Sequence, residues 1–192
     1  MIIGINGFKG SGKDTAGGYL WNKHKILPQS FAYRLKKSAA ALFNINPHDW
    51  ETYKNDDNIF VMLGKNMGPT SEAMNISNMS ARVFLQRYGT EAHREVFGTD
   101  FWVMEAIAPL DLAKSYSFTD ARFKNELEAI KSLGGYNLQI LRKKTDASDG
   151  HASEVRPPIH LIDYQIHNDG TIEEFYEKLE EFMEFLHEVE KA

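Results

Sequence analysis

The sequence predicts an α/β fold with a mostly parallel sheet, because short apolar strands alternate with helical segments along the chain. Residues 1–6 form an apolar strand that opens into a glycine-rich loop, and residues 13–24 continue as a helix. Residues 172–189 carry apolar side chains at alternating steps of three and four, which is typical of an amphipathic helix. This last stripe favours a helix docked on the sheet, with a coiled-coil seam as the alternative.

The other elements are expected from local patterns. Ser80 is a suitable N-cap for the helix that follows it, whose Val83, Phe84 and Tyr88 are expected to face inward, and Gly134-Gly135 is a suitable helix stop. Residues 44–78 are rich in Asn, Asp, Gly and Met, so they predict an irregular excursion with one short helix. The sequence then predicts strands at residues 29–32, 117–119, 136–141 and 159–167, and helices at residues 33–43, 80–97 and 125–133.

Composition excludes several classes of function. The chain has 192 residues, a net charge of −5 and no cysteine, so disulfides and thiolate metal sites are absent. The acidic balance disfavours general nucleic-acid binding, which needs a basic face. No apolar run approaches the roughly 20 residues that span a bilayer, so we expect a cytoplasmic protein without a membrane partner.

The strongest motif is the glycine-rich segment between the first strand and the first helix. Its glycines let backbone N–H groups surround phosphate oxygens, and the helix N-terminus adds partial positive charge. Lys13 is expected to reach the outer phosphates of a nucleotide. A glycine-rich turn without a nucleotide is the alternative. The residues expected to bind the nucleotide are Gly7, Lys9, Gly10, Ser11, Gly12, Lys13, Asp14 and Thr15.

The metal side of this motif departs from the common pattern. Serine or threonine usually follows the lysine and binds Mg²⁺, whereas Asp14 stands there and Thr15 comes next. Mg²⁺ prefers oxygen ligands and keeps several waters, so either Asp14 or Thr15 could serve as its ligand.

A second candidate group follows the strand predicted near residues 117–119. Ligands in open α/β sheets bind at the carboxyl ends of the strands. Asp120 could hold a Mg²⁺-bound water or an active-site arginine, and the planar guanidinium of Arg122 could bind an acceptor phosphate. A surface Asp-Arg pair is the alternative.

Two further segments are candidates for binding the substrate, one through its base and one through its phosphates. Residues 80–102 combine Arg82, Gln86 and Glu91 with Trp102, a mixture that could read and stack on a base, although an amphipathic surface helix would look the same. The basic and polar segment near His151 favours a phosphate-covering lid over a metal site, with a solvated loop as the plain alternative.

Together these segments resemble the bacteriophage deoxynucleoside monophosphate kinases. The matching pieces occur in the family's order and span nearly the whole chain. They are Gly7–Thr15 with its Gly-Lys-Asp-Thr ending, Phe31–Lys36, Leu85–Glu91 through Phe101–Val103, Thr119–Glu126, His151–Glu154 and Ile166–Thr171.

The resemblance implies a three-layer P-loop kinase fold, in which helices flank a five-stranded parallel sheet. It implies a single domain over residues 1–192, with an acceptor-binding insertion at about 33–103 and a lid at about 142–158. It places Lys36, Lys37, Arg82, Gln86 and Glu91 around the acceptor nucleotide. It also places Asp120 and Arg122 near the transferred phosphate.

The expected activity is the phosphorylation of deoxynucleoside monophosphates by ATP and Mg²⁺. Catalysis is assigned to Lys13, Arg122 and Asp120, and the partners are small nucleotide substrates, with a homodimer left open. A viral source would place the enzyme in the host cytoplasm. The alternatives are a kinase for another phosphorylated metabolite and a non-catalytic ATP-binding switch.

Overall fold

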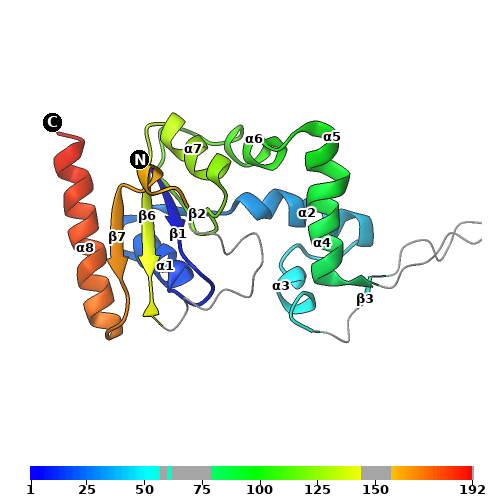
Figure 1. Ribbon diagram of the computed structural model, residues 1–192, viewed down its shortest axis with the longest axis horizontal. Coiled ribbons are helices and arrows are strands. Elements are labelled where there is room, and N and C mark those ends of the chain that lie inside the picture. Colours follow the sequence, from blue (N-terminus) through cyan, green and yellow to red (C-terminus); the bar gives the residue numbers. More distant parts are fainter. Residues whose placement is uncertain (57–59, 62–78, 144–156, 192) are drawn as a thin grey trace, which may run out of the picture. The chain divides into compact units, whose positions relative to one another are not determined.

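The computed structural model describes residues 1–56, 60–61, 79–143 and 157–191 (Figure 1). The described chain forms two compact units. One comprises Met1–Phe31 and Ile107–Ala192, and the other comprises Ala32–Ala106.

The first unit contains the sheet. Its elements are β1 (Ile2–Asn6), α1 (Lys13–His24), β2 (Leu27–Gln29), β5 (Tyr116–Phe118), α7 (Lys124–Ser132), β6 (Tyr136–Leu141), η4 (Ile159–Leu161), β7 (Tyr164–His167) and α8 (Ile172–Val189). The five strands are all parallel, in the order β2-β5-β1-β6-β7. The predicted parallel α/β fold with helices on the sheet is therefore confirmed.

Helices cover both faces of this sheet. Successive strand residues point to opposite faces, and Ile3 and Ile5 of β1 enter a core shared with α1 and α8. On the other face, a Cβ placed on Gly4 would lie 3.2 Å from the side chain of Ile130 in α7. The central strand is therefore buried between helix layers, and its carboxyl end leads directly into the glycine-rich loop.

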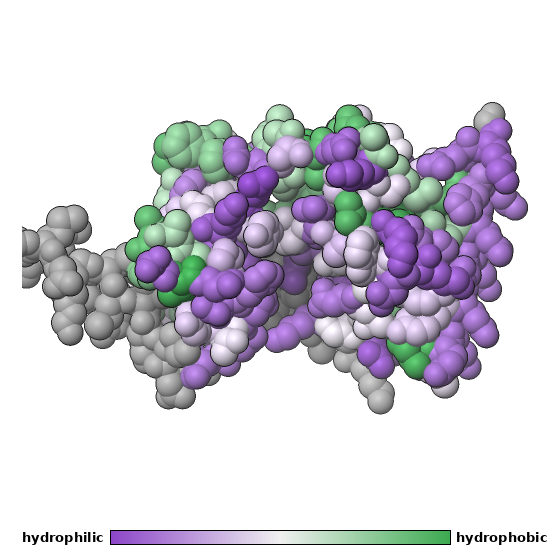
Figure 2. All heavy atoms as spheres, turned by 180° about the vertical axis from the view of Figure 1, so that it is seen from behind, coloured by the Kyte–Doolittle hydropathy of each residue, from purple (hydrophilic) through white to green (hydrophobic). Residues whose placement is uncertain are grey.

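The predicted docking of α8 on the sheet is confirmed. Its buried side chains belong to the same core as the strands, and they include Phe175, Leu179, Phe182 and Leu186. The exposed face of the helix carries Glu173, Glu177, Glu181, Glu184 and Glu188. Figure 2 shows this hydrophilic surface at the right-hand edge of the molecule. Apart from Ile172 and Val189 at its two ends, the apolar stripe is covered within the chain, which argues against a coiled-coil seam.

Two strand predictions are wrong in part. The strand expected at residues 29–32 lies at Leu27–Gln29, because the chain already turns helical at Phe31. The strand expected at residues 159–167 begins only at Tyr164, because Ile159–Leu161 forms a 3-10 turn after Pro158. Both errors concern short segments in which neighbouring elements decide the conformation.

The second unit is mainly helical. Its elements are α2 (Phe31–Phe43), α3 (Asp49–Tyr53), β3 (Phe60–Val61), β4 (Met79–Ser80), α4 (Ala81–Gly89), the π-helix η1 (Thr90–Arg94), α5 (Glu95–Phe97) and α6 (Phe101–Ile107). The Ser80 side chain accepts a hydrogen bond from the Val83 amide, as its predicted capping role requires. Phe84 is buried and Tyr88 is half-buried, but Val83 is exposed, so its predicted inward position is wrong.

A charged cluster joins α8 to α1 in the first unit. The Oε1 atom of Glu180 lies 2.7 Å from Nε2 of His24 and 2.8 Å from the Tyr19 hydroxyl, and its Oε2 lies 3.1 Å from Nζ of Lys23. Burial alone would raise the pKa of Glu180, but hydrogen bonds from His24, Tyr19 and Lys23 outweigh it and lower the pKa to about 2.

This cluster predicts acid-sensitive stability. Because the pKa of Glu180 is depressed in the folded state, its contribution is present above the ordinary carboxyl pKa of 4.5 and is lost as the pH falls toward about 2. Glu180→Gln should lower Tm at pH 7 by about 2–4 °C. The difference from wild type should shrink in thermal melts between pH 4.5 and 2, and the exposed Glu177→Gln should show no such trend. A difference that stayed constant across this range would contradict the assignment.

Candidate functional site

The glycine-rich loop connects β1 to α1 and bends back toward the end of β7. Gly12 ends the loop with a φ of 112°, in the left-handed region that favours glycine. A Cβ on Gly12 would lie 2.6 Å from Nδ2 of Asn168 and 3.3 Å from the Phe175 ring. The Asn168 side chain also donates a 2.8 Å hydrogen bond to the Ser11 carbonyl. The loop is therefore held from the β7–α8 connection, and only glycine fits at its last position.

Lys13 folds back into this loop. It is the first residue of α1 and is buried. Its Nζ donates hydrogen bonds to the carbonyl oxygens of Gly7 at 2.6 Å and Phe8 at 2.7 Å. The ammonium group thus lies inside the loop, where the sequence predicts the phosphates of a nucleotide.

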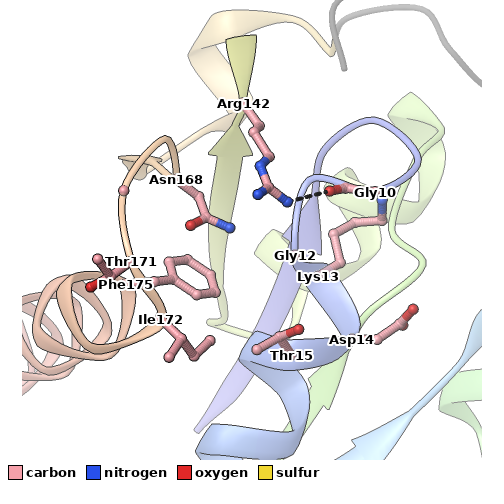
Figure 3. A pocket seen from close by; sticks show the side chains of 11 residues that line it. Gly10, Gly12, Lys13, Asp14, Thr15, Arg142, Asn168, Thr171, Ile172 and Phe175 are labelled. Atoms are coloured by element: carbon pink, nitrogen blue, oxygen red, sulfur yellow. Dashed lines mark hydrogen bonds between the residues drawn. The ribbon is translucent and has the colours of Figure 1, made fainter. Parts of the chain in front are cut away.

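A pocket of about 300 Å³ opens beside the loop (Figure 3). Arg142, just after β6, donates a 3.2 Å hydrogen bond to the Gly10 carbonyl at its edge. Ile172 and Phe175 of α8 supply apolar surface opposite the start of α1. The pocket is lined by Gly10, Gly12, Lys13, Asp14, Thr15, Arg142, Asn168, Gly170, Thr171, Ile172 and Phe175.

The two candidate metal ligands lie in the first turn of α1. Asp14 and Thr15 are both exposed, and Figure 3 shows their side chains leaving the turn in different directions. No group of three or more potential ligands among His, Cys, Asp and Glu occurs in the described residues. One or two oxygen ligands from Asp14 and Thr15 fit Mg²⁺, which is usually bound by one or two side chains together with substrate phosphates. They would not suffice for a metal ion held entirely by protein side chains.

Asp120 follows β5 and contacts Ser30 and Phe31, which belong to the same unit. Its Oδ2 accepts a 2.6 Å hydrogen bond from the Ser30 hydroxyl, and its Oδ1 accepts a 2.9 Å bond from the Phe31 amide. The geometry thus gives Asp120 an anchoring role, which the sequence did not predict.

Arg122 lies two residues further on, in a loop held by buried polar groups. The amides of Arg122 and Phe123 donate to Oε2 of Glu126 at 2.7 and 3.0 Å. The carbonyl of Ala121 accepts a 2.8 Å bond from Nδ2 of Asn6. Since β1 and β5 are adjacent and parallel, the glycine-rich loop before Lys13 and the loop with Arg122 follow the carboxyl ends of neighbouring strands.

The predicted acceptor residues belong to the second unit. Lys36 and Lys37 lie on α2, Arg82 and Gln86 on α4, and Glu91 in η1. Nη2 of Arg82 donates a 3.0 Å bond to Oδ1 of Asn55. Nε of Arg87 lies 3.7 Å from Oε1 of Glu91.

Lys36 shares a carboxylate with a second lysine. Its Nζ contacts Oε1 of Glu51, and Nζ of Lys54 lies 2.5 Å from Oε2 of the same residue. Burial alone would raise the pKa of Glu51, but hydrogen bonds from Lys36 and Lys54 outweigh it and lower the pKa. Glu51 and Lys54 were not expected at this position.

Trp102 is buried in the second unit, with 4% of its surface exposed. Its Nε1 donates a 3.0 Å bond to the Gly89 carbonyl, and the Tyr88 carbonyl receives a 2.6 Å bond from Nδ1 of His93. These side chains satisfy carbonyls where the helix changes to π geometry. The contacts give Trp102 a packing role, and base stacking by this ring stays a prediction.

The remaining predictions fall outside the described residues or were missed. His151 and most of the expected lid lie in residues 144–156, which the structure does not describe. Sequence reasoning placed Arg142 at the start of the expected lid and included Asn168 in a matching segment without giving it a role. It missed Phe175 at the pocket. Across the parts of the chain that the structure describes, no helix is long and apolar enough to cross a lipid bilayer.

Comparison with known proteins identifies the family. The family model described as deoxynucleotide monophosphate kinase matches residues 48–179. This chain belongs to the deoxynucleotide monophosphate kinase family. The family match begins after the glycine-rich loop, so the loop and the match are separate lines of support for a nucleotide kinase.

Two members of this kinase family match over most of their length, and a third matches over less than half of its own. A protein of Acanthamoeba polyphaga mimivirus, provisionally named a deoxynucleotide monophosphate kinase, is 32% identical over 93% of this chain and 94% of its own. The deoxynucleotide monophosphate kinase of Escherichia phage RB69 is 26% identical over 95% of this chain and 99% of its own. The enzyme of the same name from Enterobacteria phage T4 is 30% identical over 56% of this chain and 46% of its own.

Proposed function

We propose that this kinase transfers the terminal phosphoryl group of ATP to a deoxynucleoside monophosphate. The observation that carries the proposal is the buried Lys13 inside a glycine-rich loop at the carboxyl end of β1, in a chain of the deoxynucleotide monophosphate kinase family. The bond from the terminal phosphorus to the ADP oxygen breaks as a bond to an acceptor phosphate oxygen forms. The products are ADP and a deoxynucleoside diphosphate.

The proposed catalysis consists of positioning and charge stabilisation. Lys13 exchanges its contacts with the Gly7 and Phe8 carbonyls for the outer phosphates, and Arg122 neutralises charge on the transferred group. The acceptor phosphate oxygen is already ionised, so the reaction needs no general base. Bound Mg²⁺ would supply further charge neutralisation, with Asp14 or Thr15 as its protein ligand. Asp120 would hold a Mg²⁺-bound water or an active-site arginine, with its carboxylate kept in place by Ser30 and the Phe31 amide.

The donor would lie along the glycine-rich loop. Its triphosphate would meet the backbone of residues 7–13, which includes Lys9 and Ser11. The remainder would enter the adjacent pocket, where Ile172 and Phe175 provide apolar surface. The hydrogen bond from Asn168 to the Ser11 carbonyl would keep that pocket beside the loop.

The acceptor would be recognised by the second unit. Lys36, Lys37 and Arg82 would attract its phosphate, while Gln86 and Glu91 would read its base. Amide and carboxylate groups discriminate strongly, because a wrong base leaves them unpaired. We also propose a cytoplasmic enzyme that binds no nucleic acid, with a homodimer as an open possibility.

Two variants separate reading of the base from binding of the phosphate. Arg122→Ala should lower kcat/KM by a similar factor for every deoxynucleoside monophosphate, because all acceptors share the phosphate. Gln86→Ala should lower it unequally, by about tenfold or more for the preferred base, while ATP affinity stays unchanged. Steady-state kinetics across the four common deoxynucleoside monophosphates measure both effects. Equal losses for all bases with Gln86→Ala would remove base reading from that residue.

A further inference from the structure

A row of amide side chains crosses three strands, from the exposed Gln165 in β7 to the buried Asn6 in β1, at the sheet face covered by α7. Nε2 of Gln165 in β7 lies 2.5 Å from Oε1 of Gln139 in β6, and Nε2 of Gln139 lies 3.5 Å from Oδ1 of Asn6 in β1. The row ends where Nδ2 of Asn6 donates to the Ala121 carbonyl at 2.8 Å. Asn6 and Gln139 are 5% and 6% exposed, so the part of the row next to the loop is buried.

A buried carboxylate holds the same loop from its other side. Glu126 is 4% exposed, yet its Oε2 accepts hydrogen bonds from the amides of Arg122 and Phe123. The backbone of residues 121–123 is therefore fixed by Asn6 through a carbonyl and by Glu126 through two amides. Asn6 is also the last residue of β1, directly before the glycine-rich loop.

Glu126 also caps the start of α7 through its bond to the Phe123 amide, but stability alone does not call for the amide row. A buried amide or carboxylate is costly unless it is hydrogen-bonded, and apolar side chains of similar size fill such space without that requirement. The opposite face of the same strands is apolar, with Ile3, Ile5, Leu138 and Ile140 in the core. The polar row therefore ends at Asn6, which lies directly before the glycine-rich loop and holds the loop that contains Arg122.

We propose that Asn6 and Glu126 are positioning residues that hold the backbone of Arg122 at a fixed position relative to the glycine-rich loop. The proposal rests on the proposed function, because it requires Arg122 to meet the transferred phosphate. Charge stabilisation during transfer depends on placement, and a shift of about 1 Å can cost about a hundredfold in rate. Asn6 and Glu126 would therefore affect turnover without touching substrate.

The test is a double-mutant cycle with Arg122. Asn6→Ala and Glu126→Ala should each lower kcat by about tenfold when Arg122 is present. In the Arg122→Ala background the same changes should cost less than about threefold, because the group they position is gone. Glu126→Gln keeps a carbonyl oxygen that can accept from both amides, so it should restore most of the turnover lost in Glu126→Ala.

Asn137→Ala is the matched control. Asn137 is a fully buried amide on the same face of β6, but its Nδ2 donates to the carbonyls of Leu127 and Leu161, away from the Arg122 loop. This variant should lower Tm while kcat changes little. Should Asn6→Ala fail to fold, Glu126→Ala tests the positioning from the other side of the loop.

The outcomes separate this inference from the proposed function. Equal losses of kcat with and without Arg122, or no loss in Asn6→Ala and Glu126→Ala, would overturn the positioning role while an active wild type keeps the proposed function intact. Full activity of Arg122→Ala would also overturn it. A wild type inactive on every deoxynucleoside monophosphate would overturn the proposed function and the positioning role together.

Discussion

Lys13→Ala is expected to lower turnover by about a hundredfold or more. The ammonium group lies inside the glycine-rich loop, bonded to the Gly7 and Phe8 carbonyls, and it is placed to follow charge onto the outer phosphates. The measurement is kcat for ADP release with the purified variant, accompanied by its Tm and its affinity for ATP.

Lys124→Ala provides a control for this change, because Lys124 is an exposed cation of α7 paired with Glu128. It removes the same charge from the same unit and should leave turnover unchanged. Near-normal turnover of a folded Lys13→Ala protein would contradict the catalytic role of Lys13.

Gly12→Ala is expected to weaken ATP binding by about tenfold or more. Alanine is disfavoured by roughly 1–2 kcal/mol in the left-handed conformation that Gly12 adopts. Its Cβ would also press on Nδ2 of Asn168, which supports the loop through the Ser11 carbonyl. Equilibrium binding of ATP to the variant, with Tm measured in parallel, tests both consequences.

Gly18→Ala is the control, in the helix that follows Gly12. A Cβ added at Gly18 would meet no heavy atom within 4 Å beyond the helix's own backbone, and Gly18 shows no left-handed φ. Alanine should raise stability there, because glycine costs about 1 kcal/mol relative to alanine within a helix. Unchanged ATP affinity in Gly12→Ala would show that the loop tolerates a side chain and would contradict the steric account.

Local patterns predicted much of the fold. The helix at Lys13–His24, the strand at Tyr136–Leu141 and the helix at Ile172–Val189 have the predicted bounds. Each has a strong local cause, such as the glycine-rich start of the first or the apolar stripe of the last. The strand near residue 29 was misplaced because its end depends on Asp120, whose carboxylate accepts from the Phe31 amide 89 residues earlier in the chain.

The supporting shell of the site was not predictable in the same way. Asn168 bonds to Ser11 across 157 residues, and Asn6 bonds to Ala121 across 115. An isolated asparagine at a strand end looks like a turn or a surface residue in sequence. Only the parallel order of β1, β5, β6 and β7 brings these groups together.

The central claim is phosphoryl transfer from ATP to a deoxynucleoside monophosphate. The most direct measurement is ADP release by the wild-type enzyme with ATP, Mg²⁺ and each common deoxynucleoside or nucleoside monophosphate in turn, together with direct detection of the diphosphate product. We predict that at least one deoxynucleoside monophosphate yields its diphosphate in step with ADP. An enzyme that is inactive on every nucleotide but phosphorylates a non-nucleotide phosphate, or that binds ATP without any transfer, would contradict the account.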